Sequence, residues 1–200
     1  MYEIDREILA EARARIARDR KWDVQLKLAP PANASLAGAE VTVTSTRHAF
    51  RFGCNGFQLT ALRDADLARG YEEHFDALLN YATLPFYWGS YEATQGATRE
   101  SALRRMAAWC QERDIATKGH PLVWHEVYPE WAAALPDEEV LRLVRQRVGD
   151  LVSGFRGLVD TWDVVNEATV SHRYDNAIGR YIGQEPLAAV DEMLRLAHDA

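Results

Sequence analysis

The sequence predicts an α/β fold built on a parallel sheet, and two observations carry this prediction. Short β-type segments alternate with longer helical ones from Phe50 onward, which is typical of βα units. The composition fits a packed globular protein, because 48% of the 200 residues are hydrophobic and 10% are aromatic.

The first 49 residues are predicted to form an extension made of a helix and a small β-hairpin. Apolar residues recur at helical spacing between residues 3 and 19, which predicts one amphipathic helix. Two alternating runs follow at 24–28 and 41–44, and Pro- and Gly-containing sequence separates them. These two runs predict the two strands of the hairpin.

Residues 50–200 are predicted to hold four strands and four helices in alternation. The strand candidates are 50–54, 81–88, 115–124 and 159–167, and the helix candidates are 65–79, 98–113, 137–153 and 186–199. Asp137 is the predicted N-cap of the third helix, and Pro186 occupies a first-turn position of the last.

The number of βα units distinguishes between two architectures. A closed (β/α)8 TIM barrel takes about 250 residues, whereas residues 50–200 supply only about four βα units. The sequence therefore predicts the N-terminal half of such a barrel. A doubly wound sheet is the competing architecture, but no G-x-G-x-x-G motif follows the first strand, so its nucleotide-binding form has no support.

The net charge and the hydropathy of the chain limit the kinds of partner that are expected. The net charge of −7 opposes phosphate backbones and anionic membranes, so neither nucleic acid nor a membrane is predicted as a partner. No apolar run reaches the roughly 20 residues that span a bilayer, and the charged N-terminus does not resemble a signal peptide. Cys54 and Cys110 are predicted to be free, buried thiols. The sequence leaves the cellular location and the oligomeric state open.

Chemistry is expected at the C-terminal ends of the strands, where barrel enzymes carry their catalytic groups. The fourth strand candidate ends at Asn166 and Glu167, and an unpaired carboxylate on an otherwise apolar strand is costly to bury. A catalytic role for Glu167 would explain its position. The alternative is an acid that faces solvent or pairs with an arginine.

Two further strand ends suggest a carbohydrate site. His120 and Trp124 share one face of an extended third strand, and an aromatic face beside an imidazole suits a sugar ring. The second strand ends in an aromatic cluster, in which Tyr87 or Trp88, and with them Glu92, are predicted to line the same cleft. The alternative for both strands is an ordinary aromatic core.

Metal chemistry is not predicted, and neither is any cofactor. His120 and His125 are five residues apart, which places them on opposite faces of a strand. The H-E-x-x-H helix motif also fails, because Pro129 stands where its second histidine would be.

Two segments carry a specific family resemblance. GHPLVWH at 119–125 and WDVVNEA at 162–168 resemble the third- and fourth-strand motifs of glycoside hydrolase family 10, the endo-β-1,4-xylanases. Tyr128-Pro129-Glu130-Trp131 and Phe52-Gly53 are also similar to that family, so the resemblance covers roughly residues 50–200.

The resemblance implies a retaining mechanism with two carboxylic acids. Glu167 matches the general acid/base, Asn166 matches the residue that binds the sugar 2-hydroxyl, and His120 and Trp124 match contacts to the sugar at the point of cleavage. Asn166 and Glu167 would face opposite ways on a flat strand, so the strand is expected to bend or end there.

The chain also departs from the family pattern. The second strand of the family usually ends with a Glu-Asn pair and a nearby Lys, whereas Pro85, Phe86 and Gly89 occupy the matching stretch. The family's nucleophile lies on a later strand, past residue 200. The predicted function is thus a truncated xylanase-like glycoside hydrolase whose partner is a β-linked polysaccharide or oligosaccharide. The alternatives are a non-catalytic carbohydrate-binding relic, a barrel glycosidase with another β-glycan substrate, and a metal-dependent hydrolase.

Overall fold

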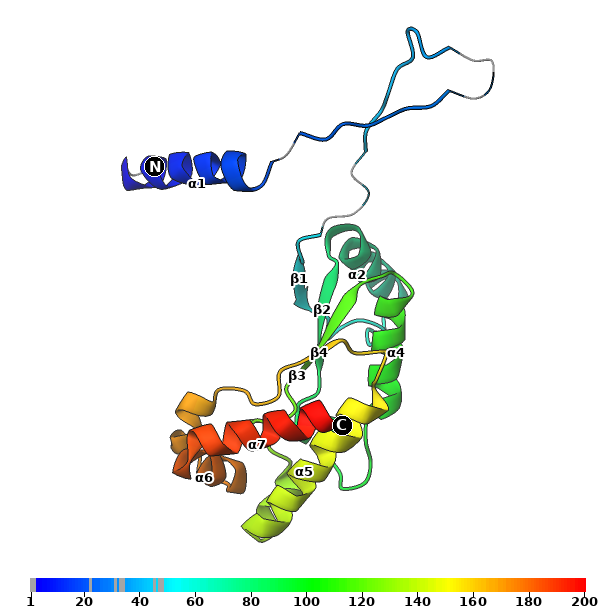
Figure 1. The fold of residues 1–200 in the computed structure, drawn as a ribbon. Helices are drawn as coiled ribbons and strands as arrows, with labels where there is room; N and C mark the ends of the chain where they lie inside the picture. The colour runs from blue at the N-terminus through cyan, green and yellow to red at the C-terminus, as the bar shows by residue number, and fades with distance from the viewer. Residues whose placement is uncertain (1–2, 22, 31, 33–34, 45, 47–48) are drawn as a thin grey trace. The chain divides into compact units, whose positions relative to one another are not determined.

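A computed structural model describes residues 3–21, 23–30, 32, 35–44, 46 and 49–200 of the chain (Figure 1). The chain divides into two compact units, Met1–Ser45 and Thr46–Ala200. Within the described residues, none of the helices combines the length and the apolar character needed to cross a bilayer.

The first unit contains the predicted helix but not the predicted hairpin. Helix α1 spans Glu3–Asp19, as the sequence predicts. The runs 24–28 and 41–44 form no strand, and their apolar side chains are exposed. An isolated two-stranded hairpin is marginally stable in water. Alternating hydrophobicity alone is therefore not enough to pair these two runs.

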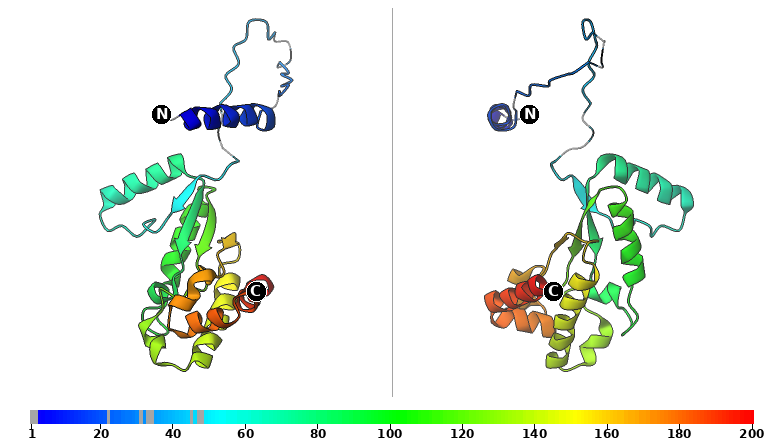
Figure 2. Two further views of the ribbon diagram at one scale, coloured as in Figure 1. Left: turned by 90° about the vertical axis from the view of Figure 1, so that its left-hand side faces the viewer. Right: turned by 45° about the vertical axis from the view of Figure 1, so that its right-hand side comes forward.

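The second unit is built on a four-stranded parallel sheet in the order β1-β2-β3-β4 (Figures 1 and 2). The strands are Gly53–Asn55, Tyr81–Pro85, Ala116–His120 and Thr161–Trp162. Each lies in or at the end of its predicted segment and follows its neighbour in sequence, as in a barrel. The predicted partial (β/α)8 architecture is confirmed.

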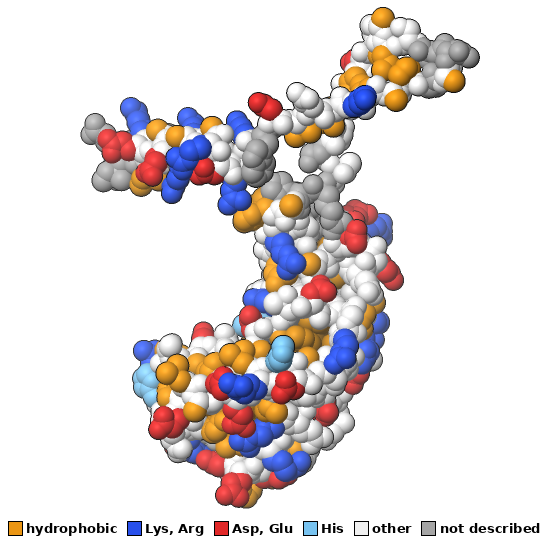
Figure 3. Space-filling view, viewed as in Figure 1, with side chains coloured by type: hydrophobic (Ala, Val, Ile, Leu, Met, Phe, Trp, Pro, Cys, Tyr) orange, Lys and Arg blue, Asp and Glu red, His pale blue; other side chains and the backbone are white. Residues whose placement is uncertain are grey.

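Helices connect the strands and supply most of the buried surface. The principal ones are α2 (Ala65–Leu78), α4 (Glu100–Gln111), α5 (Asp137–Gly154) and α7 (Pro186–Asp199), each close to its predicted range. Short helices that the sequence did not predict are α3 (Trp88–Tyr91), η1 (Glu130–Ala134), η2 (Ala168–Arg173) and α6 (Ala177–Gln184). Figure 3 shows the charged surface of this unit, with apolar side chains interspersed.

Two local predictions need correction. Asp137 is the first residue of α5 rather than its N-cap, and its carboxylate instead pairs with Arg180 at 2.7 Å. Cys110 is a free, buried thiol, and burial raises its pKa to about 12. Cys54 is also free but exposed, because it lies on the edge strand β1, whose residues are all exposed.

An aromatic cluster lies against the sheet and fixes where β3 meets β4. Phe86 packs edge-on against Phe155 and Trp162, with ring centroids 4.9 and 4.7 Å apart. The Trp162 ring covers Gly119 so closely that a Cβ added there would lie 2.2 Å from the ring. Only glycine allows this contact.

We expect Gly119→Ala to destabilise the protein by about 1–3 kcal/mol, the usual cost of overpacking a core. The new methyl group must displace the Trp162 ring. Urea unfolding would measure the change. Gly70→Ala in α2 is the matched control, because open space surrounds Gly70 and alanine favours helix. Equal stability of Gly119→Ala and the parent protein would contradict this account of the contact.

Candidate active site

The C-terminal ends of β3 and β4 continue as paired backbone beyond the strands themselves. The Leu122 amide donates to Asp163 O at 2.9 Å, and the Val123 amide donates to Val164 O at 2.8 Å. The Asn166 amide returns a hydrogen bond to Val123 O at 2.9 Å. This pairing holds the segment 120–124 beside the segment 163–167, so their side chains share one end of the sheet.

Glu167 terminates the β4 segment in a left-handed conformation, with φ 52° and ψ 38°. Residues other than glycine adopt this region at a cost of order 1–3 kcal/mol and do so disproportionately at functional sites. The expectation that the chain bends or ends at Asn166 and Glu167 is confirmed. The exposed Glu167 carboxylate accepts a hydrogen bond from Trp124 Nε1 at 3.1 Å.

Tyr87 joins His120 and Trp124 in an aromatic wall beside this carboxylate. The Tyr87 ring lies 5.3 Å from the His120 ring and 5.5 Å from the Trp124 ring, measured between centroids. Burial, together with the negative charge of Glu167, raises the pKa of the Tyr87 hydroxyl. Tyr87 therefore stays a neutral hydrogen-bonding group at neutral pH.

Asp163 holds the His120 ring in a fixed orientation. Its carboxylate lies 2.7 Å from His120 Nδ1 and 2.8 Å from Lys118 Nζ. Burial alone would raise the pKa of Asp163, but the hydrogen bonds from Lys118 and His120 hold it below its ordinary value. Because Nδ1 is engaged, Nε2 is the His120 nitrogen left to face a ligand.

Sequence reasoning missed Lys118 and Asp163. The sequence did contain a signal for both residues. Lys118 shares one face of the third strand with His120, and Asp163 is a charged residue within the otherwise apolar fourth strand segment. Asn166 is half-buried, and its backbone amide fixes it next to Val123. A contact from its side chain to a sugar hydroxyl stays a prediction.

Trp88 and Glu92 do not join this cleft, which corrects the prediction that they would. Trp88 is only 5% exposed and packs against Tyr128 and Trp131, at 5.9 and 5.6 Å. Trp88 Nε1 donates to the Glu92 carboxylate at 3.0 Å. Helix α3 begins at Trp88, so its side chain leaves the strand alternation that the prediction assumed.

His125 lies beyond the end of β3, outside the group formed by Tyr87, His120 and Trp124. Its ring is fully buried against Tyr174, at a centroid distance of 4.2 Å, and burial lowers its pKa. The part of the chain that the structure describes contains no group of three or more His, Cys, Asp or Glu side chains able to hold a metal ion.

Comparison with known proteins identifies the family. Residues 49–187 match the sequence profile described as Glycosyl hydrolase family 10. The chain belongs to this family. The matched range includes the four strands of the sheet, the Trp124–Glu167 pair and the Lys118–Asp163–His120 cluster, so these features belong to the part of the chain that matches family 10.

The individual relatives include an anti-sigma factor and xylanases, and the solved xylanases have a similar fold. The chain is 27% identical to the anti-sigma-I factor RsgI6 of Acetivibrio thermocellus over 86% of its own length and 22% of the relative's. It is 24% identical to endo-1,4-beta-xylanase 4 of Arabidopsis thaliana, over 82% and 29% of the two chains. The native xylanase 10B of Thermotoga maritima superposes with a TM-score of 0.60 at 26% identity, over 74% of this chain and 46% of the xylanase chain.

The chain thus spans less than a third of these two curated relatives and under half of the solved xylanase. The share that it does cover contains the strand ends with the candidate acid. A related solved structure, xylanase 10B of Thermotoga petrophila, is described in complex with xylobiose, with a TM-score of 0.60 at 24% identity.

We expect Asp163→Asn to remove a pH-dependent part of the stability of this family 10 chain. The folded-state pKa of Asp163 is depressed below the unfolded value of about 3.9. Its contribution is therefore present above about pH 4 and is lost as the pH falls through the lower, folded pKa. The difference in urea midpoint between the parent protein and Asp163→Asn should shrink under acid.

Asp191→Asn is the control, because the exposed Asp191 side chain pairs with the exposed Arg195 one turn further along α7. It should change the midpoint little at any pH. A parent-to-Asp163→Asn difference that stays constant from about pH 7 to about pH 3 would contradict the role assigned to this carboxylate.

Proposed function

We propose that this chain carries the general acid/base side of a retaining glycoside hydrolase that acts on a β-1,4-linked, xylan-type polysaccharide. The observation that carries the proposal is the hydrogen bond from Trp124 to Glu167 at the ends of adjacent parallel strands in a family 10 chain. A carboxyl group there can protonate the glycosidic oxygen as the leaving group departs.

The surrounding side chains supply the contacts that a sugar needs. The rings of Tyr87 and Trp124 offer apolar faces to pyranose C–H groups, and His120 Nε2 offers a hydrogen bond to a hydroxyl. Asn166 is proposed to bind the 2-hydroxyl, where a hydrogen bond strengthens as charge develops at the anomeric carbon. The roles of Trp124, His120 and Asn166 follow the family pattern residue by residue, whereas the role of Tyr87 does not.

The end of β2 bears on which substrate is bound rather than on which reaction is catalysed. Phe86 is fully buried in the aromatic cluster and cannot contact a sugar. Gly89 lies against the Tyr128 backbone, where an added Cβ would be 3.0 Å away. The polar contacts usual at this position are replaced by Tyr87, so xylan is the first substrate to test and other β-glycans are the second.

The proposed mechanism needs a second carboxylate about 5 Å across the site, to attack the anomeric carbon and form a covalent intermediate. In family 10 this nucleophile comes from a later strand than the four in this chain. The 200-residue chain is accordingly proposed to lack hydrolytic activity by itself. A longer chain that adds the rest of the barrel would retain anomeric configuration.

A non-catalytic carbohydrate-binding role is the second candidate function. One relative is named an anti-sigma factor rather than an enzyme. That name suits a module that uses the cleft for binding rather than for hydrolysis. The two candidates differ in whether Glu167 matters for turnover or only for binding.

We expect the chain of residues 1–200 to leave aryl β-xylosides and xylan intact, and the longer chain to hydrolyse both with retention. Glu167→Ala in the longer chain should abolish xylan hydrolysis, and azide should restore cleavage of an activated aryl xyloside by replacing the base-assisted water. NMR of the first product would report the stereochemistry. Glu138→Gln on the exposed first turn of α5 is the control and should keep full activity.

Undiminished xylan hydrolysis in the Glu167→Ala variant would remove Glu167 as the acid. Absence of activity in the longer chain, together with tight xylo-oligosaccharide binding, would instead establish the binding-only function.

Tyr87→Ala should weaken xylo-oligosaccharide binding roughly tenfold, because a stacked aromatic contact contributes about 0.5–1.5 kcal/mol. Calorimetric titration of the 1–200 chain with xylohexaose would measure the change. Tyr81→Ala is the matched control, because Tyr81 lies at the opposite end of the same strand, where Arg51 covers its ring. Equal affinities of Tyr87→Ala and Tyr81→Ala for the oligosaccharide would exclude Tyr87 from the cleft.

A further inference from the structure

Lys118 and His120 share one carboxylate oxygen of Asp163. Lys118 Nζ lies 2.8 Å and His120 Nδ1 lies 2.7 Å from the same atom, Asp163 Oδ2. The two donors are alternate residues of β3, so they project from the same face of that strand. Asp163 comes directly after β4, and the register between the two strands brings the three side chains together. One acceptor atom thus meets both a cation and an imidazole.

This geometry decides which ring nitrogen of His120 carries the proton. The depressed pKa of Asp163 keeps its carboxylate ionised at neutral pH, and an ionised carboxylate can only accept hydrogen bonds. Nδ1 therefore carries the proton that forms the 2.7 Å contact. In a neutral ring this leaves Nε2 with a lone pair, so Nε2 accepts a hydrogen bond and does not donate one.

The ammonium group of Lys118 acts on the charge of the His120 ring. Without Lys118, the whole negative charge of Asp163 would face His120 and would favour a second proton on the imidazole. Lys118 offsets that charge at the shared oxygen, and its own positive charge opposes an imidazolium beside it. The side chains of Lys118, His120 and Asp163 are 27%, 19% and 36% exposed, so water screens these charges only in part.

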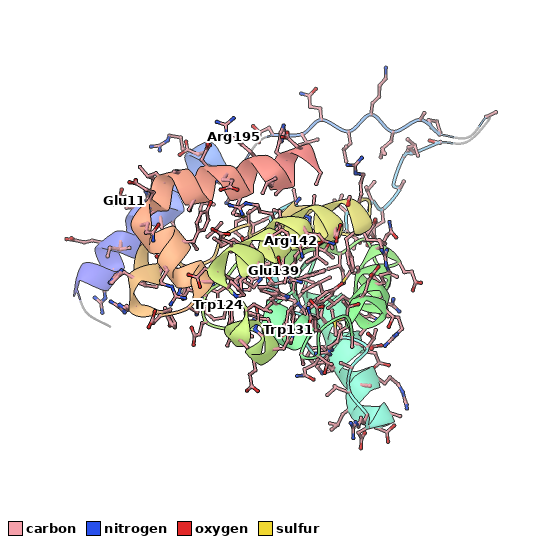
Figure 4. All side chains as sticks on the ribbon, turned by 90° about the horizontal axis from the view of Figure 1, so that it is seen from below. Glu11, Trp124, Trp131, Glu139, Arg142 and Arg195 are labelled. Carbon is pink, nitrogen blue, oxygen red and sulfur yellow. The ribbon has the colours of Figure 1, made fainter. Side chains whose placement is uncertain are left out.

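Two further titratable groups lie at this end of the sheet. The Tyr87 ring lies 5.3 Å from the His120 ring, and burial raises the pKa of its hydroxyl, so Tyr87 is neutral. Glu167 accepts a hydrogen bond from Trp124, which Figure 4 labels, at 3.1 Å. An ionised Glu167 would favour an imidazolium, as Asp163 does. Neither group can replace the positive charge of Lys118.

We propose that Lys118 is a positioning residue for the sugar site: by sharing Asp163 Oδ2 with His120, it keeps the imidazole neutral with its proton on Nδ1. Nε2 is then an acceptor, and a sugar hydroxyl that meets it donates the hydrogen bond. The role of Lys118 stands on the geometry of the cluster, whereas the sugar contact rests on the proposed function.

The test is an NMR measurement of the histidine ring nitrogens in the ¹⁵N-labelled 1–200 chain, because their shifts distinguish the two neutral tautomers from the doubly protonated ring. His120→Gln assigns the His120 signals. In the parent protein at neutral pH, Nδ1 should carry a proton and Nε2 should not. A parent ring that carries a proton on Nε2 under these conditions would overturn the proposal without the need for any variant.

Lys118→Met should raise the ratio of doubly to singly protonated His120 rings about tenfold at about pH 6, because it removes the cation and leaves Asp163 to favour the imidazolium. Lys118→Arg should restore the parent ratio, since arginine keeps the charge. Arg105→Met is the matched control, because it removes a positive charge from an exposed position of α4, and it should leave the ratio unchanged.

Urea midpoints of the three variants would show that each is folded at the pH of the measurement. A purely structural role for Lys118 would lower the midpoint without moving the protonation ratio. An unchanged ratio in folded Lys118→Met, or the same rise in Lys118→Arg as in Lys118→Met, would therefore overturn the role of the Lys118 charge.

Xylohexaose tests the sugar contact separately. A hydroxyl that donates to His120 Nε2 should shift the Nε2 signal saturably while Nδ1 keeps its proton. A saturable shift that comes with protonation of Nε2 would overturn the acceptor assignment. The absence of any shift at Nε2, with the tautomer and the Lys118→Met ratio as expected, would refute the sugar contact and with it the proposed function, and would leave the role of Lys118 supported.

Discussion

The register between β3 and β4 is the constraint on which the candidate site depends. Lys118 pairs with Thr161 and Gly119 with Trp162, an offset of 43 residues that the His120–Asp163 contact keeps. A slip of one residue would break that contact, because the two side chains would then face opposite sides of the sheet. The Trp162 ring lies so close to Gly119 that a side chain at this position would displace it, which favours this register. Further along, Val123 pairs with Val165, an offset of 42, and this shift precedes the Trp124–Glu167 contact.

The end of β2 shows how one departure from the family pattern changes both the core and the surface. Phe86 packs into the aromatic cluster with Phe155 and Trp162, and its carbonyl oxygen accepts a hydrogen bond from Arg147 of α5. Tyr87, the next residue, lies against His120 and Trp124 at the candidate site.

Sequence alone predicted the parts of the fold that depend on regular periodicity and the site residues that depend on strand ends. The four strands, the long helices and the meeting of Trp124 with Glu167 follow from those two patterns. Trp88 was misplaced because a single turn of helix beginning at that residue replaces the twofold alternation of a strand, and four residues are too few for a helical period to be detected. The hairpin at 24–28 and 41–44 failed for the opposite reason, because its alternation is clear but no packed surface supports it. The strand positions of Lys118 and Asp163 were visible in the sequence, but their contact depends on the register between β3 and β4, which no local pattern contains.

Asp163 and Glu167 lie in the same segment after β4, yet their surroundings suit them to different tasks. Asp163 is approached by Lys118 and His120, two groups that favour a negative charge on the carboxylate, and its depressed pKa keeps it ionised. Glu167 receives one neutral donor, Trp124 Nε1, is exposed, and forms no ion pair within the described residues. Two carboxylates in one site commonly divide acid and supporting roles according to such differences. An ionised Asp163 cannot supply a proton, but its carboxylate can hold the His120 ring in place. The different surroundings of the two carboxylates support the proposal of Glu167, rather than Asp163, as the acid.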